Sequence, residues 1–127
     1  MDSFLAKNSI DRVDLMKIDI EGSEFDLLTG AKSSLENGKV KAMYIEINSS
    51  ALNDHNRNPS EIFKILEKYD YQLFYPHSKI KGDIEKIKLN SKSLSLSKLD
   101  KQDIINQSKT SYALLDILAI HPSIIKN

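Results

Sequence analysis

Residues 13–24 of the chain read VDLMKIDIEGSE, and this stretch decides the fold class. The segment Val13–Ile20 is mostly apolar and ends abruptly in Glu21-Gly22, which is typical of a buried strand closed by a turn. Ser23 then stands three residues before Asp26, the spacing of a capping box, which predicts that a helix begins here. We therefore expect a strand, a tight turn and a helix in immediate succession.

A second apolar strand follows this helix. The helical spacing of apolar residues continues to Asn37-Gly38, a typical stop, and Gly30 favours a kink because glycine costs ~1 kcal/mol relative to alanine inside a helix. Residues 41–47, KAMYIEI, then predict the second buried strand. Two apolar strands joined by a helix form a right-handed crossover and a parallel pair. The predicted fold class is therefore α/β.

The rest of the chain has weaker patterns. Asn58-Pro59-Ser60-Glu61 combines an N-cap, a proline at the first helical position and an early glutamate, so we expect a helix over Pro59–Tyr69. We expect loops over 48–58 and 91–110. The second loop would contain a helical turn at 102–106, and the Ser/Leu alternation of 91–99 is typical of either an edge strand or a loop. Further strands are predicted at 71–75, 80–89 and 112–120.

Composition narrows the class of protein. A chain of 127 residues with 40% hydrophobic content can bury one core, so residues 1–127 are one domain or part of one. Its 18 basic residues balance 18 acidic ones, which argues against a nucleic-acid partner. Cysteine is absent, which excludes disulfides and a thiolate nucleophile. The sequence has no signal-like leader and no apolar run of membrane-span length, so we expect a cytoplasmic protein.

Carboxylates gather where the two predicted strands end. Asp19 and Glu21 close the first strand and Glu46 lies near the end of the second. Because ligands of parallel sheets bind beyond the carboxyl ends of the strands, we expect the three side chains to share a cleft at the end of a central parallel strand. Lys17 lies two residues before Asp19, on the same face of the strand, and is a candidate charge partner. The alternative is that these carboxylates only cap the following helix and interact with its dipole.

The stretch Val13–Glu24, followed by Leu27-Leu28-Thr29-Gly30-Ala31, resembles the signature of FkbM-family methyltransferases. Tyr44-Ile45-Glu46-Ile47 is similar to that family's next strand, and Tyr69-Asp70-Tyr71 resembles its later Gly-Tyr junction, with aspartate in place of glycine. The strand with such an aspartate is the fourth of seven in the wider class of S-adenosylmethionine-dependent enzymes. The resemblance therefore implies a partial Rossmann-like class I methyltransferase sheet, strands 4 to 7 with their helices, and the first three strands missing.

The same resemblance implies methyl transfer from S-adenosylmethionine to a sugar, glycan, lipid-linked or polyketide hydroxyl. Asp19 and Glu21 would be catalytic, and Asp19, Glu46 and Lys17 would lie near the donor. Transfer to oxygen needs alignment and removal of the hydroxyl proton, so Asp19 or Glu21 would accept the proton, or both would hold Mg²⁺. The residues alone do not decide between a general base and a metal site. The alternative functions are a non-catalytic remnant or interaction module, and a magnesium-dependent phosphate-handling domain.

The sequence contains no recognisable form of the glycine-rich turn that binds the donor in this class of enzymes. Enzymes of this class hold the donor with a glycine-rich turn, whereas the four glycines of this chain lie far apart. We therefore expect residues 1–127 to be the C-terminal portion of one FkbM-type domain, a truncated or split enzyme that is inactive alone. Without its neighbour, the strand Val13–Ile20 would form an open edge that pairs with an N-terminal half-chain or with itself.

Overall fold

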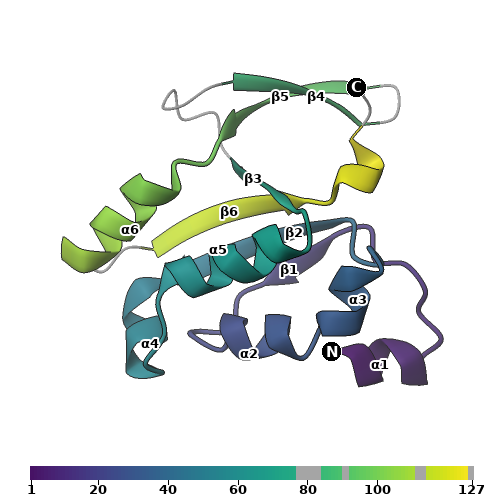
Figure 1. The fold of residues 1–127 in the computed structure, drawn as a ribbon, viewed down its shortest axis with the longest axis horizontal. Helices are drawn as coiled ribbons and strands as arrows, with labels where there is room; N and C mark the ends of the chain where they lie inside the picture. Colours follow the sequence, from purple (N-terminus) through teal and green to yellow (C-terminus); the bar gives the residue numbers. More distant parts are fainter. Residues whose placement is uncertain (77–83, 90–91, 111–113, 126–127) are drawn as a thin grey trace.

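The computed structural model describes residues 1–76, 84–89, 92–110 and 114–125, which form helices and a mixed sheet (Figure 1). The strands are β1 Met16–Ile18, β2 Ala42–Asn48, β3 Gln72–Tyr75, β4 Ile84–Leu89, β5 Lys92–Lys98 and β6 Leu114–Ile120. They make a six-stranded sheet in the order β1-β2-β6-β3-β5-β4. The helices are α1 Asp2–Lys7, α2 Glu24–Thr29, α3 Lys32–Glu36, α4 Ser49–Asp54, α5 Pro59–Lys68 and α6 Lys101–Thr110, with a 3₁₀ turn over Pro122–Ile124. The predicted α/β class is confirmed.

Strands β1 and β2 are parallel neighbours joined by α2 and α3, as predicted. Met16 lies opposite Met43, and Ile18 lies opposite Ile45. Since residues paired across parallel strands project to the same face, these four side chains point into one core. The crossover thereby places the carboxyl ends of both strands at the same edge of the sheet.

The predicted strand over Val13–Ile20 is too long. Only 16–18 belong to β1, and Val13 makes an isolated parallel bridge to Val40. β1 is the first strand in the sheet order, so it is an edge strand here and not a central one. An edge strand receives ladder hydrogen bonds from one neighbour only, which allows both flanks to leave the sheet.

Strand β6, in the range where a last strand was predicted, runs antiparallel between β2 and β3. Its register places Ile117 opposite Ile45 and Asp116 opposite Glu46. Leu73 of β3 pairs with Ala119 on its other side. The predicted range began at Tyr112, and residues 111–113 lie outside the described part of the chain.

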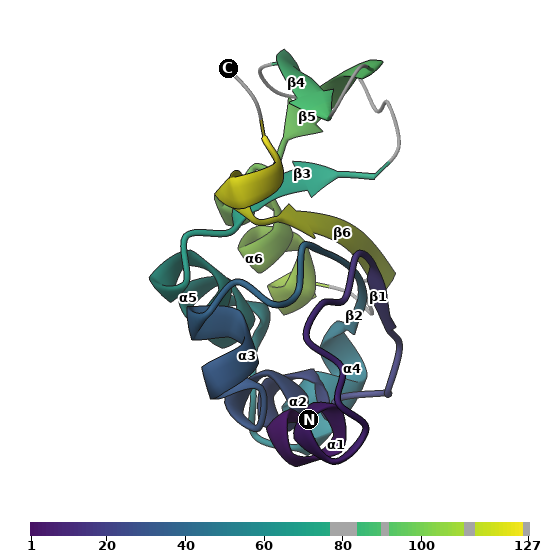
Figure 2. The same cartoon turned by 90° about the vertical axis from the view of Figure 1, so that its right-hand side faces the viewer.

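The two faces of β2 differ in cover. Met43, Ile45 and Ile47 are fully buried, whereas Tyr44 and Glu46 on the opposite face are only half-buried. Figure 2 shows α2, α3 and α5 grouped on one side of β1, β2 and β6. The buried face packs against apolar residues of these helices, among them Leu28, Leu35, Ile62 and Leu66. The other face of β1 and β2 therefore presents its side chains to the surface.

The first predicted helix is divided in two. α2 ends at Thr29 with Gly30 as its C-cap, and α3 begins at Lys32, so the predicted kink is a complete break. The predicted capping box is wrong, because the Ser23 side chain makes no capping hydrogen bond. The stop at Gly38 is confirmed, since its φ of 57° is the left-handed conformation that glycine adopts freely.

A side chain of the N-terminal helix α1 caps the N-terminus of α3. The Asp2 carboxylate accepts hydrogen bonds from the backbone N–H groups of Ser33 at 2.8 Å and Ser34 at 3.0 Å, and from the Ser34 hydroxyl. Burial opposes ionisation of Asp2, but these hydrogen bonds outweigh it and lower its pKa. A negative group at a helix N-terminus is also favoured by the helix dipole. This contact attaches α1 to the crossover.

Two predicted loops contain regular structure. Residues 48–58 include α4, residues 92–98 form β5, and residues 101–110 form α6, of which only one turn, at 102–106, was predicted. β5 is not an edge strand, because it pairs with both β3 and β4. The helix over Pro59–Tyr69 and the strand at 71–75 are confirmed to within one residue, and the first of these has the Asn58/Glu61 capping box. The strand predicted at 80–89 is described from Ile84 onward. None of the described helices has the length and apolarity that crossing a membrane requires.

Tyr71 ties β3 to the end of the crossover. Its hydroxyl donates to the backbone oxygen of Val40 at 2.5 Å, and burial raises the pKa of Tyr71 to about 12. We expect Tyr71→Phe to lower the free energy of unfolding by about 1 kcal/mol at pH 7. Tyr69→Phe is the control, with an expected change below about 0.5 kcal/mol.

The pKa shift of Tyr71 adds a pH dependence to this difference. Because the folded state holds the phenol proton more tightly than the unfolded chain, the extra stability is complete below pH 10 and is lost as the pH rises towards 12. Urea titrations of wild type and Tyr71→Phe at several pH values measure both effects. An equal loss of stability in both proteins over this range would contradict the assignment.

Candidate functional site

Asp19, Glu21 and Glu46 come together where β1 and β2 end. One carboxylate oxygen from each lies within 4.8 Å of the other two. The chain turns sharply after β1, since Glu21 and Gly22 both have left-handed φ angles, 50° and 96°. This turn carries Glu21 back over the end of β2. The three residues that the sequence singled out are therefore one cluster, with Asp19 and Glu21 exposed and Glu46 partly buried.

One lysine partly balances the charge of this cluster. Lys17 Nζ donates to Asp19 Oδ2 at 2.7 Å, so the predicted pairing exists. The hydrogen bond and the charge of Asp19 raise the pKa of Lys17. Partial burial, and then the charges of Asp19 and Asp116, raise the pKa of Glu46. Three carboxylates against one ammonium leave excess negative charge at this edge of the sheet, which favours binding of a cation or a proton.

Asn48 positions Glu21, a role that sequence reasoning did not predict. Its amide nitrogen donates to Glu21 Oε2 at 2.9 Å, while its amide oxygen accepts from the backbone N–H groups of Ser50 and Ala51, both at 3.1 Å. One side chain therefore caps α4 and holds the carboxylate. The sequence signal was an asparagine directly after the predicted strand 41–47, because asparagine is a common helix N-cap.

Glycine at position 22 lets the turn pack against α4. A Cβ there would lie 2.5 Å from the backbone oxygen of Ala51, a distance that excludes any side chain. The Gly22 N–H donates to Glu24 Oε1 at 3.2 Å. Glu24 is fully buried, and its Oε2 has no hydrogen-bond partner among the described residues. The motif Glu21-Gly22-Ser23-Glu24 thus builds the turn as well as supplying a surface carboxylate.

A second polar pair lies beside the cluster on the uncovered face. Tyr44 on β2 hydrogen-bonds Asp116 on β6, and this bond, followed by burial, raises the pKa of Tyr44. Asp116 lies directly opposite Glu46 in the sheet. Sequence reasoning missed both residues. The signal was a single carboxylate inside the otherwise apolar run of β6.

The geometry of Gly22 gives a stability test with a matched control. We expect Gly22→Ala to lower the free energy of unfolding by more than about 1 kcal/mol, because its φ of 96° is strained for alanine and the added Cβ meets the Ala51 carbonyl. Gly30 has a φ of −73°, so Gly30→Ala should change stability by less than about 1 kcal/mol in either direction. Thermal or urea unfolding measures both. Equal effects of the two substitutions would show that the turn is not under this constraint.

Comparison with known proteins identifies the family. The model of the methyltransferase FkbM domain matches residues 1–73, which is more than half of the 127 residues and includes β1, β2 and all three clustered carboxylates. No curated protein and no solved structure matched the chain. The matched segment carries the turn that the structure shows packed against α4. The chain therefore belongs to the FkbM methyltransferase domain family.

Proposed function

We propose that this chain supplies the catalytic edge of an S-adenosylmethionine-dependent O-methyltransferase. The observation that carries the proposal is the convergence of Asp19, Glu21 and Glu46 within 4.8 Å at the carboxyl ends of two parallel strands, inside the segment that matches the family. In open α/β sheets this is the edge at which ligands bind. The acceptor would be a hydroxyl of a sugar, glycan, lipid-linked molecule or polyketide.

The charges of the cluster suit the proposed donor. S-adenosylmethionine, when bound, supplies an electrophilic methyl group on a positively charged sulfur. Asp19, Glu21 and Glu46 carry more negative charge than Lys17 neutralises, which is favourable beside a sulfonium. Lys17 holds Asp19 in one orientation, and Asn48 holds Glu21. Preorganised groups of this kind lower the barrier more than mobile ones.

The proton of the acceptor hydroxyl has to be removed or weakened. Asp19 or Glu21 can accept it as a general base, which typically contributes about 10²–10⁴ in rate. The alternative is that Asp19 and Glu21 hold Mg²⁺, because hard oxygen ligands suit that ion and a bound cation lowers the pKa of a hydroxyl. The proximity of Glu46 supports either role, since a proton or a cation relieves the repulsion among three carboxylates.

We propose the edge of β1 as a docking site for further strands of a Rossmann-like class I sheet. Among the described residues β1 has a neighbouring strand on one side only, and Leu15 and Ile20, which flank it, are 63% and 38% exposed. An unpaired strand with exposed apolar flanks favours pairing with another strand. The occupant we propose is a strand of an N-terminal half-chain, which would also cover the open face of β2. Self-association through this edge is the alternative outcome.

The same edge supports the second candidate function, an interaction module without activity. This function needs only the exposed β1 edge, and the clustered carboxylates would then contribute to solubility. The two functions differ in what happens when the carboxylates are changed, because only an enzyme loses turnover.

Substitution of the carboxylates tests the catalytic proposal. With an N-terminal half of an FkbM-type domain supplied in trans, we expect Asp19→Asn and Glu21→Gln to lower S-adenosylhomocysteine formation by roughly a hundredfold or more. Asp11→Asn, a change at a side chain that is 94% exposed, is the control. Removal of Mg²⁺ with a chelator separates the two mechanisms, since only the metal mechanism loses turnover. Full activity of both carboxylate variants would rule out the proposed site.

Donor affinity provides an independent test. We expect the chain alone to bind S-adenosylmethionine more weakly than about 1 mM, because several polar contacts worth about 1–3 kcal/mol each are not provided by a carboxylate cluster at one end of the ligand. Calorimetric titration with and without the N-terminal half measures the difference. Micromolar affinity of the isolated chain would mean that other residues of the chain hold the donor.

A further inference from the structure

A polar cavity of about 930 Å³ lies between α4, the start of α5 and the end of α6. Figure 1 shows these three helix ends together on the left of the molecule. The volume is in the range that small-molecule sites occupy. Its walls are mostly hydroxyl, amide and charged side chains, so it favours a hydrophilic ligand.

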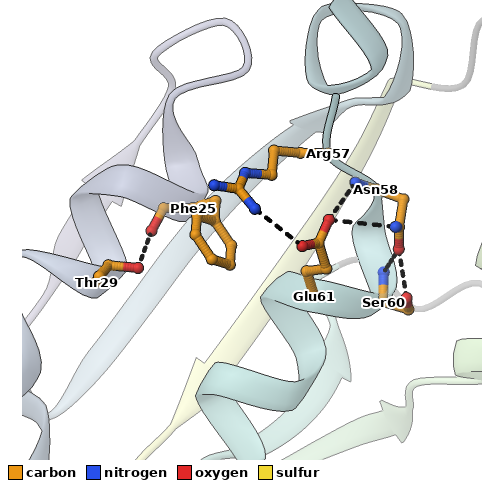
Figure 3. Close-up of polar contacts among 6 residues, drawn as sticks. All are labelled: Phe25, Thr29, Arg57, Asn58, Ser60 and Glu61. Carbon is orange, nitrogen blue, oxygen red and sulfur yellow. Dashed lines mark hydrogen bonds and ion pairs between the residues drawn. The ribbon is translucent and has the colours of Figure 1, made fainter. Parts of the chain in front are cut away.

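Arg57 is a polar group of this wall that contacts two helices. Its guanidinium lies 3.8 Å from the centre of the Phe25 ring, and its Nη1 donates to Glu61 Oε1 at 3.2 Å (Figure 3). Glu61 is itself fixed, because its Oε2 accepts from the Asn58 backbone N–H at 3.0 Å. Phe25 belongs to α2 and Glu61 to α5, so two helices orient one guanidinium. Its side chain remains 37% exposed.

A guanidinium held in this way is preorganised for an oxyanion. Arginine carries five N–H donors in a planar fork that matches carboxylate and phosphate groups, and the bond to Glu61 uses Nη1 only. Lys109 adds a second positive charge from α6. Ser50, Asn53 and Asp54 on α4 offer donors and acceptors for hydroxyl groups. The lining therefore fits a molecule that carries both an oxyanion and hydroxyls.

The cavity is connected to the carboxylate cluster through α4. Asn48, which donates to Glu21, directly precedes Ser49 and Ser50 of the cavity wall. The backbone of Ala51, the next residue of α4, lies against Gly22 in the turn after β1. A ligand in the cavity therefore lies one short helix away from the proposed base.

We propose that this cavity is the acceptor subsite and binds a hydroxylated small molecule through a carboxylate or phosphate group held by Arg57. The acceptor role of the cavity rests on the proposed methyl transfer, whereas ligand binding itself needs neither donor nor turnover. Arg57 is a binding residue in this proposal, and Glu61 is a positioning residue that also limits affinity by competing for the guanidinium.

Amide NMR titrations of the full chain with D-glucuronate, D-glucose 6-phosphate and D-glucose test the proposal. We expect at least one of the two anions to shift the amide signals of Ser50, Asn53 and Lys109 and to bind about tenfold or more tightly than glucose, as a charge-assisted hydrogen bond predicts. The tighter anion identifies the oxyanion as carboxylate or phosphate. Equal binding of glucose, shifts at other residues only, or no binding at millimolar concentration would overturn the proposal.

Variants at four positions give the matched comparison. Arg57→Gln should lower the affinity for the anion about tenfold or more, and Lys109→Gln, on the exposed surface of α6, should lower this affinity less. Glu61→Gln should raise the affinity for the anion, because glutamine keeps an oxygen for the helix cap and removes the charge that competes for Arg57. Lys64→Gln removes a positive charge from the same helix outside this cavity and should have no effect. Thermal melts verify folding of each variant. Equal losses for Arg57→Gln and Lys64→Gln, or a weaker Glu61→Gln complex, would overturn the proposal.

Discussion

The contact between Gly22 and the backbone oxygen of Ala51 is the constraint on which the arrangement of the site depends. A Cβ would lie 2.5 Å from that oxygen, so the turn after β1 can pack against α4 only with glycine. The left-handed backbone at Glu21 and Gly22 then reverses the chain and brings Glu21 within reach of Asn48. A local steric requirement thereby joins the end of one parallel strand to the helix that follows the other. The carboxylate cluster is a consequence of this junction.

The difference between the two faces of the sheet explains where the charges lie. The face towards the helices is closed by aliphatic side chains such as Ile18 and Ile45, whose burial drives folding. The other face presents Lys17, Glu46 and Asp116 at neighbouring positions of three strands. These ionisable groups do not contribute to the packing of the core, and the repulsion among the carboxylates lowers the stability of the fold. The catalytic role that we propose for the carboxylates gives a reason for their presence there.

Local patterns predicted the elements with a clear cap or apolar periodicity well and the other elements badly. The helix α5 has a complete capping box and an apolar stripe, and its predicted bounds were right to within one residue. α4 was missed because its six residues contain only two apolar side chains, Ala51 and Leu52, so its packing and the Asn48 cap stabilise it rather than its periodicity. β5 and α6 were predicted only in part, as an edge strand or loop over 91–99 and as one helical turn at 102–106, for a related reason. β5 is defined by pairing with strands on both sides, and α6 by the burial of Ile104, neither of which a local sequence window contains.

The sequence by itself determined the family, the α/β class, the parallel order of the first two strands and the choice of Asp19, Glu21 and Glu46, because each of these depends on residue spacing along a short stretch. Only the tertiary structure decided that β1 is short, that Asn48 holds Glu21 across 27 positions of sequence, and that Arg57 is fixed over Phe25 beside a polar cavity. These contacts join residues that are distant along the chain. The physical reason is that hydrogen bonding and packing act over a few ångströms in space, and the fold alone determines which distant residues come that close.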